Sequence, residues 1–201
     1  MKQNDYFYRK LHSLMGVVPI GGYLFFHLIA NYYATKGPEA YNRMVEWIEG
    51  LPFLIFLEIF LIYIPILFHA IYGLYMAFQS TNNVGNYGYF RNVMFVMQRI
   101  TGMIAFVFIA WHVYETRIQK ALGAEVSFDM MADILTNPWM FAFYTVGIIA
   151  TIFHFSNGMW SFLVSWGITV GPGSQRISTY VWMTVFFILS AIALRTLFAF
   201  I

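Results

Sequence analysis

The chain has 201 residues, of which 60% are hydrophobic, 21% aromatic and only 10% charged. Soluble globular domains carry about 25% charged residues, so this composition excludes an ordinary water-soluble protein and indicates a membrane protein. Cysteine is absent, which excludes disulfides, thiolate metal sites and iron–sulfur clusters held by this chain. The net charge of +2, without a long basic run, gives no indication of nucleic-acid binding.

Five apolar stretches are long enough to cross a bilayer as helices, since a crossing of about 30 Å needs about 20 residues. They cover residues 11–33, 53–79, 92–118, 139–164 and 179–201. The short connections leave no room for a second domain, so residues 1–201 are expected to form one all-α transmembrane domain. The first stretch has no convincing small-residue cleavage site, and is therefore expected to be a retained helix and not a signal peptide.

The connections differ in character. Residues 38–48 begin with a proline, which is favourable in a first helical turn, and residues 128–135 offer Asp129 as a helix cap. Both are predicted to contain helices that lie along the membrane interface. Residues 80–88 and 171–176 are rich in Gly, Asn and Pro, and predict turns.

Basic residues outside the spans indicate the orientation in the membrane. The side that holds the N-terminus has six Lys and Arg residues, and the opposite side has five, together with seven acids. The positive-inside rule counts basic residues and gives acids little weight. The N-terminus is therefore expected in the cytoplasm and the C-terminus outside.

Four of the five histidines lie well inside the apolar spans, one in each of the first four, whereas His12 lies at the very start of the first span. His27 and His112 each lie about 9 Å from the outer ends of their helices, at a rise of 1.5 Å per residue. His69 and His154 each lie about 15 Å from the inner ends. The spacing therefore predicts two pairs at two depths, about 10 to 15 Å apart, His27 with His112 and His69 with His154.

Two imidazoles at one depth suggest a particular ligand. Zinc needs three or four protein ligands, whereas a haem needs only two axial ligands on opposite faces of its macrocycle. Each pair thus predicts one b haem, with four of the five helices forming a dihaem bundle. Gly73 and Gly158 lie four residues after a histidine, on the same helix face, and are predicted to leave room for a porphyrin. Such haems would carry electrons and do no substrate chemistry.

Other interpretations stay open on these observations alone. A single membrane histidine is more often structural, and small residues such as glycine commonly mediate helix packing. A proton- or ion-transporting bundle would also use histidines, but would more often combine them with acids, and Glu58 is the only acid well inside a span. An interaction-only anchor without cofactors is a further alternative.

Several segments together resemble one known family along the whole chain. They are RKLHSLMG at 9–16, LPF with LEIF at 51–60, HAIYG at 69–73, QRITG at 98–102, WHVYETR at 111–117 and HFSNGMWS at 154–161. The set resembles the single-chain, five-helix, dihaem cytochrome b anchors of succinate:quinone oxidoreductases found in Bacillus-type bacteria.

The resemblance implies that His27 and His112 hold an outer, low-potential haem, and that His69 and His154 hold an inner, high-potential haem. It also implies two partner subunits on the cytoplasmic side of the bacterial membrane, a flavoprotein that oxidises succinate and an iron–sulfur protein that docks on the inner face. Electrons would then pass through both haems to a quinone, menaquinone in this family. The alternative within related families is a quinol:fumarate reductase anchor, which works in the opposite direction.

Residues near the inner level are candidates for supporting roles. Arg99 lies about 12 Å into the third span, and would either pair with a haem propionate or reach the interface. Arg9, His12 and Ser13 cluster at the inner mouth of the first span, where they would bind a propionate, dock the iron–sulfur subunit or line an inner quinone site. His12 is expected to be a non-ligand in contact with water.

Glu58 is the candidate catalytic residue. It lies about 8 Å from the outer end of the second span, at the depth of the outer haem. Quinone reduction consumes two protons, which a carboxylic acid near the acceptor would relay. Arg195 has a similar depth and is a candidate ion-pair partner for Glu58 or for an outer propionate; mutual neutralisation of the two residues is the simpler alternative.

Overall fold

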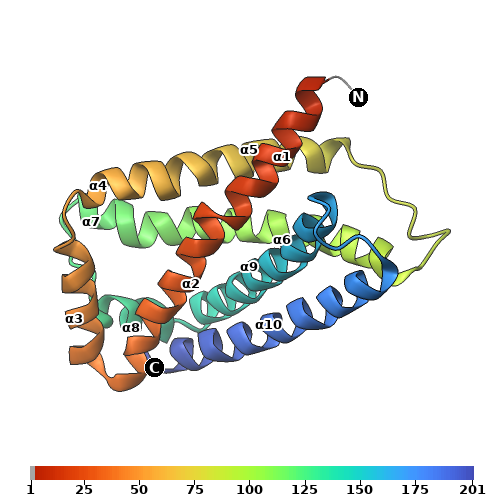
Figure 1. Ribbon diagram of the computed structural model, residues 1–201. Coiled ribbons are helices and arrows are strands. Elements are labelled where there is room, and N and C mark those ends of the chain that lie inside the picture. Colours follow the sequence, from red (N-terminus) through yellow and green to blue (C-terminus); the bar gives the residue numbers. More distant parts are fainter. Residues whose placement is uncertain (1–2) are drawn as a thin grey trace.

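The computed structural model describes residues 3–201, which are mostly helical and include no strand (Figure 1). Five helical stretches are long and apolar enough to cross a membrane, which confirms the predicted all-α membrane fold. They are Asp5–Lys36, Leu54–Gln79, Phe90–Ala121, Pro138–Ser165 and Pro172–Phe198.

The first span is two helices, α1 (Gln3–Val17) and α2 (Pro19–Tyr32), followed by a 3₁₀ turn, η1 (Tyr33–Lys36). The interruption at Val18 arises because the proline that starts α2 has no N–H and its ring crowds the preceding turn. As a result α1 packs against the second and fourth spans, whereas α2 packs against the second and fifth.

The second span contains a wider turn. It consists of α4 (Leu54–Leu57), a π-helical segment η2 (Glu58–Tyr63) and α5 (Ile64–Gln79). Pro65 lies two residues after this segment, and its ring crowds the carbonyl of the residue four positions earlier, which favours the extra residue in the turn before it. The π segment therefore ends at Tyr63, two residues before the proline.

The third and fourth spans match their predicted ranges closely. The third is α6 (Phe90–Val113) with a second π segment, η3 (Tyr114–Ile118), and a last short turn, α7 (Gln119–Ala121). The fourth is α9 (Pro138–Ser165), whose first turn is capped by the Asn137 side chain.

The fifth span begins earlier than predicted. Helix α10 (Pro172–Phe198) includes most of the stretch at 171–176 that predicts a turn. The Ser174 hydroxyl exchanges hydrogen bonds with the backbone N–H and C=O of Gly171, which stabilises the first turn, and a proline is favourable there because it needs no N–H partner. The expected turn residues are therefore helix-start residues.

Two amphipathic helices, α3 (Pro38–Glu49) and α8 (Phe128–Thr136), confirm the helices expected in the connections. The N-cap of α8 is Ser127, whose hydroxyl accepts the Met130 N–H at 3.2 Å, and not Asp129, which lies inside the first turn. Extended backbone precedes the helix at Ser127, so that residue alone has the cap geometry.

These two helices lie together at one end of the bundle, beside the C-terminus (Figure 1). The Asn42 side chain of α3 accepts the Phe128 N–H at 2.8 Å, and Tyr41 packs edge-on to Phe128 and Phe200. Burial raises the pKa of Tyr41 to about 12, so its hydroxyl stays protonated. We call this the C-terminal end, and the opposite end, with the N-terminus and residues 80–89, the N-terminal end.

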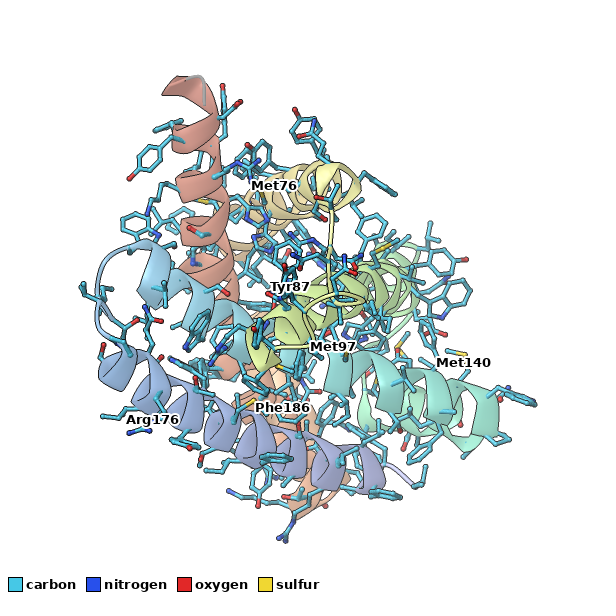
Figure 2. All side chains as sticks on the ribbon, turned by 90° about the vertical axis from the view of Figure 1, so that its right-hand side faces the viewer. Met76, Tyr87, Met97, Met140, Arg176 and Phe186 are labelled. Atoms are coloured by element: carbon cyan, nitrogen blue, oxygen red, sulfur yellow. The ribbon has the colours of Figure 1, made fainter. Side chains whose placement is uncertain are left out.

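Helix α9 lies at the centre and packs against α6, α10, α1 and α8. Many large apolar side chains face outward from the bundle (Figure 2). On the second span Phe60, Leu67 and Ile71 are each more than half exposed, at 63%, 58% and 65%. Such a surface is expected against lipid and is costly in water.

Candidate functional site

The structure brings the four span histidines together in the two predicted pairs. The ring centroids of His27 on α2 and His112 on α6 lie 5.8 Å apart, and those of His69 on α5 and His154 on α9 lie 6.1 Å apart. In both pairs the rings are nearly perpendicular, at 75° and 86°. The predicted proximity is confirmed, while the role of these residues as metal ligands stays a prediction. We call His27 with His112 the outer pair, and His69 with His154 the inner pair.

The pairs lie at different depths in the bundle. The inner pair contacts α6 beside Gly102, and the outer pair includes His112 of the same helix. Ten residues of helix separate these positions, which corresponds to about 15 Å. This agrees with the separation expected from the sequence, and the inner pair lies nearer the N-terminal end.

Backbone carbonyls orient the inner pair. His69 Nδ1 lies 2.9 Å from the His12 carbonyl oxygen, and His154 Nδ1 lies 3.0 Å from the Gln98 carbonyl oxygen. A carbonyl oxygen only accepts, so each Nδ1 carries the proton and each Nε2 keeps its lone pair. This is the tautomer that a metal-binding histidine needs.

Two glycines make room for these imidazoles. A Cβ on Gly102 would lie 2.8 Å from His154 Cε1, and a Cβ on Gly16 would strike the His69 ring. Both glycines lie on neighbouring helices, so the rings pack directly against backbone. The inner pair is thus seated between α1, α5, α6 and α9.

Tyrosines flank the outer pair. The Tyr23 hydroxyl lies 3.4 Å from His27 Nδ1, and the Tyr144 hydroxyl lies 3.3 Å from His112 Nδ1. Asn31 lies 3.3 Å from His27 Nε2 and donates to the His27 carbonyl at 2.8 Å. Apart from Asn31, the polar groups therefore meet the Nδ1 side of the outer imidazoles.

The geometry of both pairs fits an axial haem ligand set. A metal–imidazole bond to a first-row metal such as zinc is about 2.0–2.1 Å long, so two imidazoles on opposite sides of one metal have ring centroids about 6.4 Å apart. The observed distances of 5.8 and 6.1 Å are slightly shorter than this value. The tautomers of the inner pair fit as well, because the carbonyl contacts at Nδ1 leave Nε2 unprotonated in both rings. The Gln98 amide nitrogen lies 3.5 Å from Nε2 of His154.

The two glycines predicted to face a porphyrin have other neighbours. A Cβ on Gly73 would lie 3.0 Å from His12 Nε2, and a Cβ on Gly158 would lie 3.2 Å from Gln98 Nε2. Both positions border the inner pair, since His12 and Gln98 contact His69 and His154. Their role as porphyrin contacts stays a prediction.

The three candidates at the inner mouth of the first span have different surroundings. The His12 ring stacks on His69, with centroids 4.0 Å apart and planes 9° apart, so it packs against the inner pair and is not simply a wet residue. Arg9 is exposed and lies 3.6 Å from the Met76 sulfur. Ser13 donates to Lys10 and accepts from Trp166, which ties α1 to the end of α9.

Arg99 lies beside the end of α5. Its Nε donates to the Ser80 hydroxyl, its Nη1 donates to the Phe95 carbonyl at 2.7 Å, and its guanidinium covers the Phe95 ring at 3.3 Å. These contacts turn it toward the N-terminal end of the bundle. Its pairing with a propionate stays a prediction.

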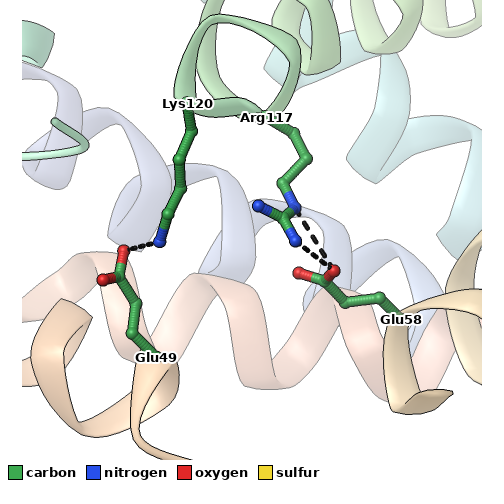
Figure 3. Close-up of polar contacts among 4 residues, drawn as sticks. All are labelled: Glu49, Glu58, Arg117 and Lys120. Atoms are coloured by element: carbon green, nitrogen blue, oxygen red, sulfur yellow. Dashed lines mark hydrogen bonds and ion pairs between the residues drawn. The ribbon is translucent and has the colours of Figure 1, made fainter. Parts of the chain in front are cut away.

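Glu58 forms an ion pair with Arg117, and not with Arg195. Arg117 Nη2 and Nε donate to Glu58 Oε2 at 2.6 and 3.2 Å (Figure 3). The Glu58 side chain is only 14% exposed. Arg195 instead lies 6.0 Å from the Tyr32 ring centre. Since Arg117 lies five residues after His112, the pair borders the outer level.

Sequence reasoning missed several residues that the structure places at the histidines, namely Gly16, Gln98, Gly102, Glu115 and Tyr144. Four of them lie inside segments that carry the family resemblance, RKLHSLMG, QRITG and WHVYETR. Those segments were a usable signal for them. Tyr144 lies outside these segments, and only the packing of α9 against α6 identifies it.

Comparison with known proteins agrees with the family resemblance of these segments. Residues 82–193 match the family model of the succinate dehydrogenase/fumarate reductase transmembrane subunit. The chain is also 54% identical, over 197 residues, to the succinate dehydrogenase cytochrome b558 subunit of Bacillus subtilis (strain 168), a match that covers 98% of each chain. The chain therefore belongs to the family of succinate dehydrogenase and fumarate reductase transmembrane subunits.

Proposed function

We propose that this chain holds two b haems and carries electrons across the membrane, from an iron–sulfur subunit to a quinone. One observation carries the proposal, namely two pairs of facing imidazoles, at two depths, contributed by four spanning helices. His69 and His154 are the proposed axial ligands near the N-terminal end, and His27 and His112 those near the C-terminal end. A bis-histidine haem supplies one-electron transfer and offers no open coordination position.

The residues around the pairs support this role in physical terms. The carbonyls of His12 and Gln98 hold the Nδ1 protons of the inner pair, which leaves Nε2 of both rings unprotonated. The surrounding apolar helices exclude water, so both imidazoles stay neutral and available as ligands. Arg9, Arg99, His12 and Ser13 lie on the N-terminal side of the inner pair, where a propionate or a docked subunit would meet them.

We propose a flavoprotein and an iron–sulfur protein as partners, bound to the N-terminal end in the cytoplasm. The name of the Bacillus subtilis relative supports succinate oxidation as the physiological direction, with fumarate reduction as the reverse reaction of the same family. The basic residues of the N-terminal side support a cytoplasmic N-terminus in the bacterial cell membrane. Menaquinone is the proposed acceptor because the family resemblance implies it.

We propose that the quinone is reduced near the outer pair, with Glu58 as its proton donor. Both Arg117 hydrogen bonds end on Oε2, and Oε1 accepts no hydrogen bond from any residue that the structure describes. The carboxylate therefore has one oxygen held and one available. Such a group can pass protons without leaving its position.

The proposal is tested by a reduced-minus-oxidised visible spectrum of the purified chain. We expect two b-type haems per chain in the unaltered protein. Replacing His69 or His154 by alanine should remove the inner haem and spare much of the outer one. A cofactor-free anchor and a histidine-based proton channel both predict a spectrum without b-type bands.

A further inference from the structure

Tyr144 links one histidine of the outer pair to a carboxylate. It is the largest side chain with almost no exposure, at 2%. Its hydroxyl lies 3.3 Å from His112 Nδ1 and donates to Glu115 Oε2 at 2.9 Å. His112 and Glu115 belong to the third span and Tyr144 to the fourth, so the contact depends on the packing of α9 against α6.

The direction of these hydrogen bonds follows from the donors available. A tyrosine hydroxyl has one proton, and Tyr144 donates it to the Glu115 carboxylate, which only accepts. The hydroxyl oxygen is then free to accept the Nδ1–H of His112. The series of hydrogen bonds therefore runs from imidazole to hydroxyl to carboxylate. In such a series each hydrogen bond polarises and strengthens the next one. It also leaves Nε2 of His112 unprotonated and free to bind a metal.

The Nδ1 atoms of the other three histidines lie beside neutral oxygen atoms. His69 and His154 donate to backbone carbonyls, and His27 lies beside the Tyr23 hydroxyl at 3.4 Å. Among the described residues, no carboxylate accepts a hydrogen bond from Tyr23. His112 is thus the one member of the four whose Nδ1 is connected to a negative charge by hydrogen bonds that the structure describes.

Aromatic packing fixes the same ring. Phe108 stacks on His112 at 5.8 Å with planes 20° apart, and its edge contacts Tyr144 at 5.3 Å. A Cβ on Gly147 would collide with Phe108, so α9 approaches closely enough to hold Phe108 and Tyr144 against the imidazole. The hydrogen-bond chain therefore acts on a ring that has little freedom to turn.

From this geometry we propose that Tyr144 and Glu115 are positioning residues that lower the reduction potential of the outer haem relative to the inner one. The proposal rests on the proposed function, since it concerns the haem that His112 would bind. A carboxylate that pulls on the Nδ1–H makes Nε2 a stronger electron donor, which stabilises the oxidised state of the bound iron. Neutral carbonyl acceptors at the inner pair have a weaker effect.

The test is a potentiometric measurement of both haems in the whole complex, followed by optical absorption. The Tyr144→Phe substitution removes the hydroxyl and keeps the ring. We expect it to favour the reduced form of the outer haem by about threefold to tenfold, the worth of one hydrogen bond, or about 28–59 mV for a one-electron couple. The inner haem should keep its potential. The spectrum of the His69→Ala variant, which retains the outer haem alone, assigns the bands.

Two further variants complete the design. Glu115→Gln keeps an acceptor oxygen but removes the charge, and should shift the outer haem in the same direction by a smaller amount. Tyr41→Phe removes a hydroxyl from another buried tyrosine, which packs against phenylalanines at the C-terminal end, and should shift neither haem.

The outcomes separate the two proposals. Two haems in the unaltered protein, with neither potential changed by Tyr144→Phe, would overturn the positioning role and leave the electron-transfer function intact. An unaltered protein without b-type haem would overturn the function itself. If Tyr144→Phe loses the outer haem entirely, Glu115→Gln decides, because an unchanged outer potential in that variant would also overturn the positioning role.

Discussion

Two neighbouring ion pairs, both between the third span and earlier parts of the chain, differ in their surroundings. Glu58 pairs with Arg117 where the two side chains are 14% and 34% exposed, whereas Glu49 pairs with Lys120 at 41% and 29% (Figure 3). A carboxylate removed from water depends more strongly on its cation than one at the surface does. Glu58 is therefore the more buried of the two acids and depends more on its cation, which supports its proposed role inside the span.

Replacing Glu58 by glutamine should slow quinone reduction about 100-fold or more, because the amide keeps the shape of the side chain but cannot donate or accept the transferred proton. Both haems should stay bound, as judged by the visible spectrum. Glu49→Gln is the matched control, since it breaks the neighbouring pair at the interface and should leave turnover unchanged. Normal turnover of the Glu58 variant with both haems present would remove Glu58 from the proton path.

A methyl group at Gly102 should disturb the inner pair alone. The added Cβ would lie 2.8 Å from His154 Cε1, closer than non-bonded carbons approach, so the imidazole must shift. We expect Gly102→Ala to reduce the content of inner haem and spare the outer haem, measured as haem per protein from the two absorption bands. Gly22→Ala, where a Cβ meets nothing within 4 Å, should leave both. Equal haem contents in the two variants would contradict the proposed seat of His154.

The depth of a single residue in the bundle could be predicted from the sequence, whereas the direction of its side chain around the helix axis could not. Helical rise converts sequence position into depth, so the partners of His27 and His69 follow from counting residues. Glu58 and Arg195 also have similar depths, yet they face different neighbours, because the angle of a side chain around its helix acts only through the packing of that helix on others. The same reason explains why Tyr144 was missed.

Helix irregularities decide which way the polar side chains of the spans point. Glu58 is the first residue of π segment η2, and Arg117 lies in π segment η3, so the ion pair joins two widened turns. One extra residue in a turn rotates the helix before it by about 100° relative to the helix after it. The π turn in the second span thereby sets the direction of Glu58 relative to His69 on the same span.

Replacing Pro65 by alanine should remove the cause of that widened turn. A regular α-helix would then rotate Glu58 away from Arg117, and we expect quinone reduction to fall as it does in Glu58→Gln, with both haems retained. In the Glu58→Gln background the same change should have little further effect, because both substitutions act through one pair. Pro38→Ala, in the first turn of α3, serves as the control and should not alter turnover. Additive losses in the double variant would show that Pro65 acts elsewhere.

Element boundaries illustrate how tertiary context overrides local signals. Gly171 and its neighbours have the composition of a turn, but a proline and Ser174 together start α10 there. In α8 the acid at position 129 looked like a cap, whereas the extended backbone needed for capping occurs at Ser127. The long apolar stretches predicted which parts of the chain are helices. They did not predict the first residue of each helix, because that depends on hydrogen bonds that composition does not reveal.

At the scale of the whole molecule, the two histidine pairs form a path that runs along the bundle, with electrons proposed to enter from the N-terminal end. If the quinone is reduced near the outer pair, negative charge moves outward across part of the membrane. Each elementary charge that crosses a potential of 100 mV involves about 2.3 kcal/mol. Turnover would then depend on the membrane potential, because electrons enter and leave the bundle at different depths.

Abolishing the membrane potential in energised vesicles should therefore change the rate of succinate-driven quinone reduction. With protons taken up from outside and electrons supplied from inside, we expect the rate to fall when an ionophore removes the potential. The oxidation of succinate with a water-soluble dye that accepts electrons from the partner subunits is the control, and should not respond. A quinone-reduction rate that is indifferent to the potential would contradict an outer site for the quinone.

The pair of amphipathic helices at the C-terminal end has one more consequence. Helices α3 and α8, joined through Asn42 and the ring cluster of Tyr41, Phe128 and Phe200, lie across that end as a cover. If the C-terminal end faces the outside as proposed, a protein in the external medium would meet these helices before the outer pair, whereas a lipid-soluble acceptor would approach from the bilayer. In that orientation the two helices would restrict electron transfer from the outer pair to acceptors dissolved in the membrane.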